Sequence, residues 1–306
     1  MATHTVRRAV IPAGGLDNGF LPAAKAVPME MLPLVDRPLI QYAVEEARAA
    51  GIEDIVIVTG RGKGTIEDHF DCAVELEDSL RRNGKRGALA AIEDSCPRSG
   101  TIAYIRQQQP LGLTHALWCA RHFVGREPFA VLLPDEVFLA KAPCLAQMAT
   151  AYRRVGGNLV AVMPASRGHA TRHGAIVGRR RDDGLLAASG VDVRPASRAE
   201  PTRWAAVGRY IFDATTIDCL DPAGSLAFAD VLTRCIADGA LHGYAFAGRH
   251  FDCSDALGLF EANIAFTLAR TEFAPTARNL LVRYAHLASD ANRLEPADST
   301  ALRVPA

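Results

Sequence analysis

The sequence predicts an α/β protein with a central mixed, mainly parallel β-sheet and helices on both of its faces. Strand-length apolar segments alternate with segments of helical periodicity, and a glycine-rich loop follows the first apolar segment. Such alternation is typical of parallel strands that are joined by helical crossovers. With 306 residues, 49% of them hydrophobic, the chain is long and apolar enough to bury a sizeable core.

The first half of the chain carries the clearest alternation. We expect strands at Arg8–Ala13, Asp54–Thr59, Thr101–Gln107 and Phe129–Leu133, and helices after Asp36-Arg37-Pro38, within 64–95 and at 112–122. Pro38 is compatible with a first helical turn, and Gly51 supplies a helix stop. Asn83-Gly84 interrupts the helical periodicity of 64–95.

After Pro143 the pattern becomes less regular. We expect helices from there to about Arg154, at about 226–238 and at about 255–270, with strands at Leu159–Met163, Ala175–Val177 and Ala205–Phe212. Asp182-Asp183-Gly184 is a hairpin-type turn signal. The polar tail from about Ser289 is expected to be mobile.

Charge and composition exclude several classes of protein. Lys and Arg together equal Asp and Glu at 34 each, so the basic footprint of a nucleic-acid-binding protein is missing. No apolar run reaches the roughly eighteen residues of a membrane span, and the first residues lack the apolar core of a signal peptide. Seven cysteines without metal-ligand spacing favour reduced thiols and a cytoplasmic protein.

The glycine-rich loop, PAGGLDNGFLP at 12–22, does not fit the common phosphate-binding motifs. Gly14, Gly15 and Gly19 do not match the G-x-G-x-x-G spacing, and no acidic residue ends the second strand to hold a ribose. The Gly-Lys-Ser/Thr of a Walker A loop is also missing. A dinucleotide-binding Rossmann unit and a P-loop are therefore both disfavoured.

This loop, with the later segments IRQQQPLGLTHALW, FAVLLPD, AAVGRYIF and FDCSDALG, resembles the bacterial UTP–glucose-1-phosphate uridylyltransferases in order and spacing. The resemblance spans about residues 7–270. It implies a Rossmann-like nucleotidyltransferase fold in a single domain at 1–270. Its nucleotide-binding half would be about 1–140 and its sugar-binding half about 141–270, followed by a C-terminal helix and tail at 271–306.

The family's reaction, as the resemblance implies it, is attack by a sugar-1-phosphate oxygen on the α-phosphorus of UTP, with pyrophosphate leaving. Such a transfer depends on positioning, Mg²⁺ and surrounding cations. The resemblance implies Asp135 and Asp252 as Mg²⁺ ligands, and carboxylate oxygens suit this hard cation. Taken alone, either aspartate could equally be a solvated residue at a strand end.

The resemblance also assigns the substrate-binding residues. Those implied for the nucleotide are Ala13, Gly14, Gly15, Glu30, Gln107 and Gly112. Gln107 would read the pyrimidine edge, because one amide supplies both a donor and an acceptor. Gly174 and Arg194 are implied for the sugar phosphate, and Lys25 and Arg194 for catalysis.

Several positions depart from the family pattern. Gly19 stands where the family has an arginine that clamps the triphosphate, and Met29 stands in place of a lysine. Asp17 replaces a glycine of the loop, and Thr114 replaces a glycine near the base and could crowd its pocket. Arg194 retains a positive charge in the motif Val193-Arg194-Pro195, with different geometry from lysine. Removing one preorganised charge donor typically costs about a hundredfold to a thousandfold in rate.

Two functions therefore remain open. The chain could be a working or weakened uridylyltransferase that uses UTP and glucose-1-phosphate. Alternatively, it could be an inactive paralogue that binds a nucleotide or UDP-sugar and modulates an active sister subunit in a hetero-oligomer. Candidate replacement cations are Lys25, Arg172, Arg179–Arg181 and Arg203, although 179–184 also reads as a solvated hairpin tip. A homo-oligomer, dimer or tetramer, is expected, and the apolar run at 280–287 could form its interface or pack on its own core.

Overall fold

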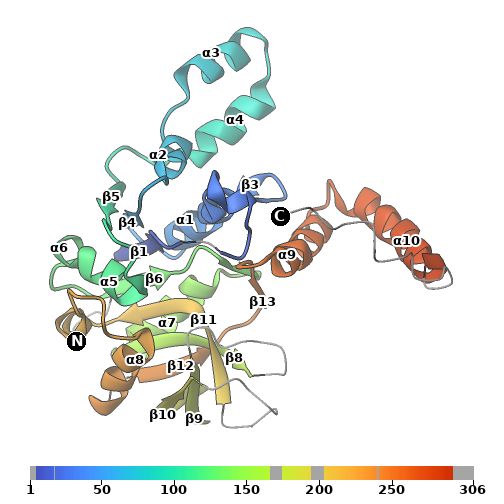
Figure 1. Ribbon diagram of the computed structural model, residues 1–306. Helices are drawn as coiled ribbons and strands as arrows, with labels where there is room; N and C mark the ends of the chain where they lie inside the picture. The colour runs from blue at the N-terminus through green and yellow to red at the C-terminus, as the bar shows by residue number, and fades with distance from the viewer. Residues whose placement is uncertain (1–4, 17, 166–173, 194–202, 240, 292–306) are drawn as a thin grey trace, which may run out of the picture.

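The computed structural model describes residues 5–16, 18–165, 174–193, 203–239 and 241–291, with the backbone alone for 287–291. Its centre is a nine-stranded sheet in the order β5-β4-β1-β6-β11-β8-β12-β10-β9 (Figure 1). In chain order its strands are β1 (Arg8–Ala13), β4 (Asp54–Thr59), β5 (Ile102–Arg106), β6 (Phe129–Leu132), β8 (Asn158–Pro164), β9 (Ala175–Arg180), β10 (Leu185–Asp192), β11 (Arg203–Phe212) and β12 (Leu241–Ala245).

The strands of the N-terminal half pair in parallel, as expected. β4 pairs with β5 on one side and with β1 on the other, and β1 also pairs with β6. These strands are short, almost fully buried runs of Val, Ile and Ala, which suits strands covered on both faces. Because they are parallel, their carboxyl ends meet at one edge of the sheet, where Gly14, Gln107 and Asp135 follow β1, β5 and β6.

The C-terminal half is joined to this parallel part by the long strand β11. β11 pairs antiparallel with both β6 and β8, whereas β8 and β12 are parallel. β10 pairs antiparallel with β12 and with β9, and the predicted turn at 182–184 joins β9 to β10. The whole sheet is therefore mixed, and its continuous parallel run lies at the β5-β4-β1-β6 end.

Several strands carry too weak a pattern to be expected from the sequence. β10 and β12 read LLAASGVD and LHGYA, with glycine and alanine where alternating branched residues would mark a strand. A second, two-stranded sheet pairs β7 (Glu136–Leu139) with β13 (Arg249–Asp252). A third pairs two-residue strands, β2 (Pro33–Leu34) and β3 (Arg37–Pro38).

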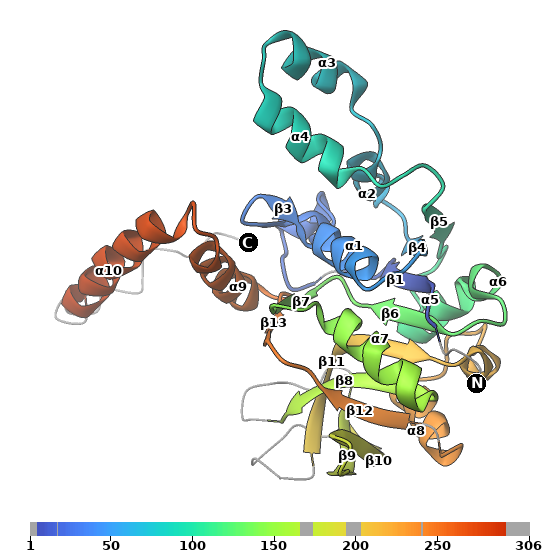
Figure 2. The same ribbon diagram turned by 180° about the vertical axis from the view of Figure 1, so that it is seen from behind.

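Helices cover both faces of the large sheet, as Figures 1 and 2 show from opposite sides. On one face α1 (Leu39–Ala49) and α7 (Cys144–Val155) bury side chains such as Ile40 and Met148 in one apolar cluster. On the other face α5 (Gly112–Cys119), α6 (Arg121–Val124) and α8 (Phe228–Ala237) bury Leu117, Val124 and Leu232 in a second. The predicted covering of both faces is confirmed.

A helical hairpin projects from the body between β4 and β5 (Figures 1 and 2). α2 (Gly64–Phe70) packs on the core through Ile66 and Phe70, whereas α3 (Val74–Arg82) and α4 (Arg86–Ser95) contain no buried residue. The turn between α3 and α4 is the predicted Asn83-Gly84 break, and Gly84 has a φ of 66° that suits glycine.

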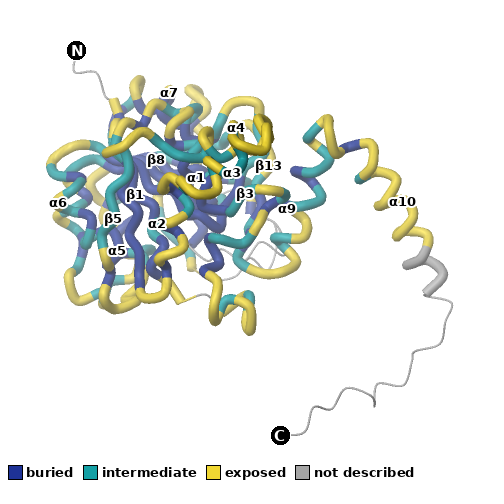
Figure 3. Tube along the Cα trace, turned by 90° about the horizontal axis from the view of Figure 1, so that it is seen from above, coloured by how far each residue is buried: buried dark blue, intermediate teal, exposed yellow. Residues whose placement is uncertain are grey.

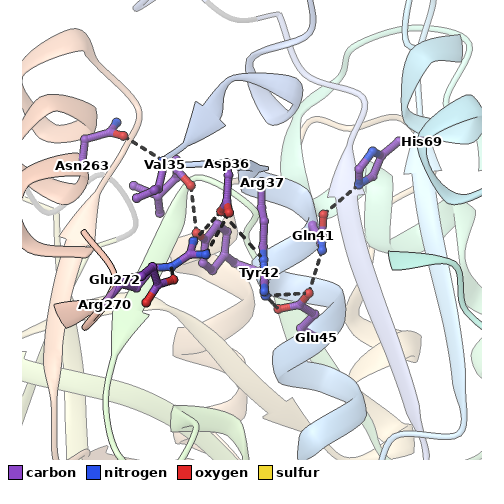
Figure 4. Close-up of polar contacts among 11 residues, drawn as sticks. Val35, Asp36, Arg37, Gln41, Tyr42, Glu45, His69, Asn263, Arg270 and Glu272 are labelled. Atoms are coloured by element: carbon purple, nitrogen blue, oxygen red, sulfur yellow. Dashed lines mark hydrogen bonds and ion pairs between the residues drawn. The ribbon is translucent and has the colours of Figure 1, made fainter. Parts of the chain in front are cut away.

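The last two helices, α9 (Ala256–Ala269) and α10 (Ala274–Ala291), form a second projection, an arm that extends sideways from the body in Figures 1 and 2. Figure 3 shows α10 extending away from the body and largely exposed. Arg270, after α9, fixes the base of the arm because its Nη2 donates to Asp36 Oδ2 at 2.8 Å. Figure 4 shows the polar contacts continuing from there along α1, through Arg37, Glu45 and Gln41 to His69 on α2.

Arg270 also holds the pKa of the Asp36 carboxyl below its usual range, chiefly by hydrogen bonding.

Within the described part of the chain, no helix is long and apolar enough to cross a membrane. The polar tail beyond α10 lies outside the described residues.

Candidate active site

A cavity of about 200 Å³ opens where β1, β5 and β6 end. Five of the residues expected to bind the nucleotide line it together with the predicted metal ligand Asp135; the five are Gly14, Gly15, Glu30, Gln107 and Gly112. The remaining lining residues are Pro12, Leu16, Met29, Leu113, Ala116, Leu133 and Pro134. Ala13 is buried at the end of β1, directly before the first of the two loop glycines.

Position 14 requires glycine, because atoms of neighbouring residues approach its backbone too closely for a side chain. A Cβ at this position would lie 2.6 Å from Oε1 of Gln107 and 3.3 Å from the carbonyl oxygen of Thr59. The backbone of Gln107 is itself tied to β4, since its N–H donates to Thr59 O at 2.8 Å. Gly14 therefore brings the glycine loop against the amide that follows β5.

The Gln107 side chain is buried, and its orientation is fixed by two neighbours. Its Nε2 donates to the carbonyl oxygen of Gly112 at 3.1 Å and lies 2.9 Å from Nδ1 of His115. His115 is stacked on Trp118 and lies one helical turn into α5. Apart from that spacing no sequence signal marks His115, yet it determines how the amide of Gln107 is presented.

The other residues near the start of α5 also have clear positions. Gly112 has a φ of 88°, a left-handed conformation that favours glycine. Thr114 is buried in α5 and is not among the residues that line the cavity. The crowding of the pocket by Thr114 that the sequence suggested is therefore not found.

Glu30 forms a buried ion pair with Lys63 in the wall of the cavity. Lys63 Nζ lies 2.6 Å from Oε2 and 2.9 Å from Oε1 of Glu30. The lysine is 7% exposed and the glutamate 3%. Glu30 belongs to the short helix Met29–Met31, and Lys63 caps the start of α2, more than thirty residues away, so only the fold brings them together.

In the part of the chain that the structure describes, the cavity lining carries no positively charged side chain. Of the described residues that border the cavity, none is a lysine or an arginine. Met29 borders it and is 7% exposed, so the thioether occupies the place where the resemblance implies a lysine. Lys25 ends the helix Ala23–Lys25 and is exposed outside the lining, so the structure does not bring it to the other site residues. Asp17 and Arg194 lie outside the described residues.

The two predicted metal ligands come from neighbouring strands of the small sheet. Asp135 directly precedes β7 and Asp252 ends β13, and the ladder sets Asp252 opposite Glu136. The N–H of Cys253 donates to the carbonyl oxygen of Asp135 at 2.7 Å. Burial, followed by the charges of Glu136, Asp252 and Asp135, raises the pKa of the Cys253 thiol.

This pair of carboxylates suits Mg²⁺. Among the described residues no group of three or more His, Cys, Asp or Glu side chains could hold a metal ion. A cation held by Asp135 and Asp252 would therefore need water or phosphate oxygens as its other ligands. Mg²⁺ commonly binds in this manner, through one or two carboxylates together with water and substrate phosphates.

A buried arginine supports the turn that carries Asp135. Arg209, which is 1% exposed, donates to the carbonyl oxygens of Leu133 at 2.8 Å and of Glu136 at 2.7 Å, on either side of Pro134-Asp135. Glu46 of α1 holds the guanidinium at 2.9 Å. The carboxylate of Glu136 in turn bonds His250 on β13. Arg209 therefore fixes the position of the Asp135 backbone.

The expected sugar side is only partly described. Gly174 directly precedes β9 and has a φ of 88°, and a Cβ there would lie 2.8 Å from Cγ1 of Val191. Arg203 is buried 3.5 Å from Asp192, and Arg179–Arg181 are exposed at the β9–β10 hairpin, away from the cavity lining. Arg172 lies outside the described residues. Where they are described, these arginines do not replace a cation of the cavity.

Comparison with known proteins agrees with this geometry. Residues 8–265 match the sequence profile of the family described as Nucleotidyl transferase. The chain belongs to this family. It is 38% identical over 257 residues to a UTP–glucose-1-phosphate uridylyltransferase of Komagataeibacter xylinus, covering 82% of this chain and 90% of the relative. It is 39% identical to the UTP–glucose-1-phosphate uridylyltransferase YngB of Bacillus subtilis, covering 91% and 94%.

Solved structures of nucleotidyl transferases have the same fold. A UTP-bound UDP-glucose pyrophosphorylase from Acinetobacter baumannii has a TM-score of 0.83 at 32% identity, covering 90% of this chain and 99% of that one. A UDP-glucose pyrophosphorylase complexed with UDP-glucose has a TM-score of 0.74 at 32% identity, covering 87% and 100%. The family resemblance and the mixed α/β fold predicted from the sequence are confirmed.

Proposed function

We propose that this nucleotidyl transferase is a UTP–glucose-1-phosphate uridylyltransferase, which converts UTP and glucose-1-phosphate into UDP-glucose and pyrophosphate. The observation that carries the proposal is the cavity beyond β1, β5 and β6, where Gln107 and Asp135 meet the glycine loop. Relatives that are named for this activity align with most of the chain.

In this proposal the N-terminal half binds the nucleotide. Gln107, held by His115, reads the uracil edge, and the glycine loop from Ala13 to Gly15 brings backbone close to the nucleotide. Glu30, paired with Lys63, supports the ribose side of the cavity wall. Uracil recognition of this kind uses an amide and needs no charge.

Asp135 and Asp252 would hold Mg²⁺, and the C-terminal half would receive the sugar phosphate, with Gly174 and Arg194 as its proposed contacts. When bound, Mg²⁺ supplies charge neutralisation on the phosphates. The residues of the chain contribute positioning, with Arg209 fixing the Asp135 turn so that the reactants lie in line. Residues 1–140 and 141–270 divide these tasks within one domain.

The rate of this enzyme is expected to be low. The described lining lacks lysine and arginine, so developing charge on the phosphates meets little preorganised positive charge. We expect turnover at least roughly a thousandfold below that of a relative with both cations. The same observation favours a second candidate, a non-catalytic paralogue that binds nucleotide and modulates an active subunit.

The deciding experiment is pyrophosphate release from UTP and glucose-1-phosphate with Mg²⁺, using the purified chain. Slow release that is abolished in Asp135→Asn supports the weakened enzyme. Release that is unchanged in Asp135→Asn would come from a contaminant and would contradict it. Undetectable release together with uridine-selective binding supports the paralogue. Turnover near the enzyme median of about ten per second would show that other cations complete the site.

We also propose that the protein is cytoplasmic. A second copy of the chain, we further propose, packs on the α9–α10 arm. Apolar side chains stay exposed along the arm, among them Leu257 at 80%, Phe260 at 63% and Tyr284 at 60%. A groove between α9 and α10 adds Leu280 and Leu281. An apolar surface of this kind marks a contact site. Light scattering should show a dimer or larger, and Phe260→Glu together with Leu281→Glu should give a monomer.

A further inference from the structure

Two cysteines lie at the base of the α3–α4 hairpin, outside the site already described. Cys72 precedes α3, and Cys96 directly follows the last residue of α4. The chain reaches Cys72 from β4 through α2, and it returns from Cys96 to β5. The two thiols therefore belong to the two segments by which the projecting hairpin is attached to the sheet (Figure 1).

The fold places the Cys96 thiol beside the segment that carries Cys72. Cys96 Sγ lies 3.5 Å from the carbonyl oxygen of Asp71, the residue before Cys72. Burial is the main cause of the raised pKa of the Cys96 thiol, and the neighbouring Cys72 raises this pKa further. Cys72 is exposed and Cys96 half-buried, so solutes can reach at least one sulfur of the pair.

A second pair of cysteines provides an internal comparison. Cys219 is close enough to Cys235 to raise the pKa of the Cys235 thiol, although burial is the larger cause. Cys235 is only 2% exposed, and its Sγ lies 3.8 Å from Oγ1 of Thr216. Thiol–disulfide exchange needs access of the attacking reagent to sulfur. The Cys219–Cys235 pair therefore lacks the accessibility that Cys72 and Cys96 share.

We propose that Cys72 and Cys96 are a reversible dithiol–disulfide site that reacts with low-molecular-weight disulfides. The Cys72 thiolate attacks one sulfur of the external disulfide, expels the first thiolate and forms a mixed disulfide. The Cys96 thiolate then attacks the Cys72 sulfur and expels the second. Two protein thiols are oxidised, one external disulfide is reduced to two thiols, and these take up the two protons.

The local backbone is compatible with such a bond. Neither cysteine lies inside a helix, and Cys96 has the extended angles φ −79° and ψ 118°. Segments outside helices can adjust to the Cα separation of about 5.5–6 Å that disulfides prefer. Because α3 and α4 bury no residue against the body, the hairpin depends on its two ends for its position. The disulfide would fasten these ends together.

The test uses the full chain, reduced and then equilibrated with oxidised glutathione. Alkylation followed by peptide mass mapping should show two of the seven thiols lost and a peptide linked through Cys72 and Cys96. Hydrogen exchange of 74–95 should become slower in the oxidised protein. Cys96→Ser should retain glutathione on Cys72 without slower exchange, whereas the control Cys219→Ser should behave as the parent.

Three outcomes would overturn the proposal. One is persistent glutathione on Cys72 of the parent protein with no internal link. Another is a link that involves Cys219, Cys235 or any other cysteine in place of the pair. The third is equally slowed exchange of 74–95 in Cys96→Ser, because the slowing would then not come from the disulfide.

Discussion

Gly19 packs directly against the carbonyl group of Ser254, so that a Cβ at Gly19 would lie 2.0 Å from Ser254 O. The glycine loop after β1 therefore touches the segment that follows Asp252. The absence of a side chain at Gly19 permits the loop to approach the segment that follows Asp252, at the end of β13. Replacing Gly19 with arginine would restore a charge and would also force these two segments apart.

Gly19→Ala should therefore disturb the contact without adding charge. We expect a loss of about 1–3 kcal/mol in the free energy of unfolding and faster hydrogen exchange at 252–258. Gly15→Ala is the matched control, because nothing lies within 4 Å of a Cβ built at Gly15. Equal stability of the two variants in urea would show that the loop does not rest on Ser254 in solution.

Met29→Lys should add a cation to a lining whose described residues have none. We expect UTP to bind roughly tenfold more tightly, with little change for uridine, because one charge contact with phosphate is worth on the order of 1–2 kcal/mol. Calorimetry with uridine, UMP, UDP and UTP in the presence of Mg²⁺ measures this. The affinity of the parent should change little from uridine to UTP as phosphates are added, and Met29→Gln should show the same pattern as the parent. Steeply tighter binding by the parent with each added phosphate would contradict the expectation.

Lys63→Met should leave the buried carboxylate of Glu30 without its lysine partner. Removing one member of a buried ion pair typically costs about 3–5 kcal/mol. The double variant Lys63→Met, Glu30→Gln should recover part of this loss, because it also removes the buried charge. Urea unfolding of both variants checks the prediction. A single variant as stable as the parent would rule out a structural role for the pair.

Gly208→Ala should disturb the turn that carries Asp135. Gly208 has a φ of 70°, and a Cβ there would lie 2.5 Å from Cγ of Glu136. We expect a loss of about 2–4 kcal/mol and weaker binding of Mn²⁺ as a probe for Mg²⁺. Gly190→Ala on β10 is the control, since no atom lies within 4 Å of its built Cβ. Unchanged Mn²⁺ binding by Gly208→Ala would show that this turn does not support the proposed metal site.

Stability should decline between about pH 7 and pH 5.5, because burial lowers the pKa values of His69 and His242. For His242, the charge of Arg181 lowers the pKa further. In this window the unfolded chain binds more protons than the folded chain, so the contribution is present above the ordinary pKa of about 6.5 and is lost as pH falls. Asp36, with its lowered pKa, acts only in more acidic solution.

Replacing both histidines by glutamine should flatten this decline. An amide at 69 keeps a partner for Oε1 of Gln41, which His69 contacts at 3.0 Å, and it does not titrate. Urea unfolding from pH 8 to pH 5.5 compares the parent with the double variant. The same slope in both proteins would assign the pH dependence to other groups.

Much of the fold could be predicted because its signals are local. β1 and β4 are short, largely buried apolar runs that contain Val and Ile, with charged or polar residues or glycine at their ends. β7, β10, β12 and β13 are short or rich in glycine and alanine, and they are stabilised by pairing with distant strands. Such partners cannot be read from the segments themselves.

The candidate site likewise contains some residues that the sequence could predict and others that only the fold brings together. Gln107, Gly112 and Asp135 follow recognisable segments of the chain, and they do line one cavity. Lys63 and His115 belong to it only through contacts that the fold creates. The space beside Gly19 is likewise a tertiary property, since Ser254 comes from the far end of the chain.

Strand β11 hydrogen-bonds to β6 along one side and to β8 along the other, and its register shifts between Ala206 and Tyr210. At this irregularity Gly208 and Arg209 turn toward the Asp135 turn. A hinge rotation between the two halves would break this ladder of backbone hydrogen bonds. The proposed nucleotide and sugar subsites are therefore carried on one stiff platform, and any closure over the substrates has to come from the segments beyond the strand ends.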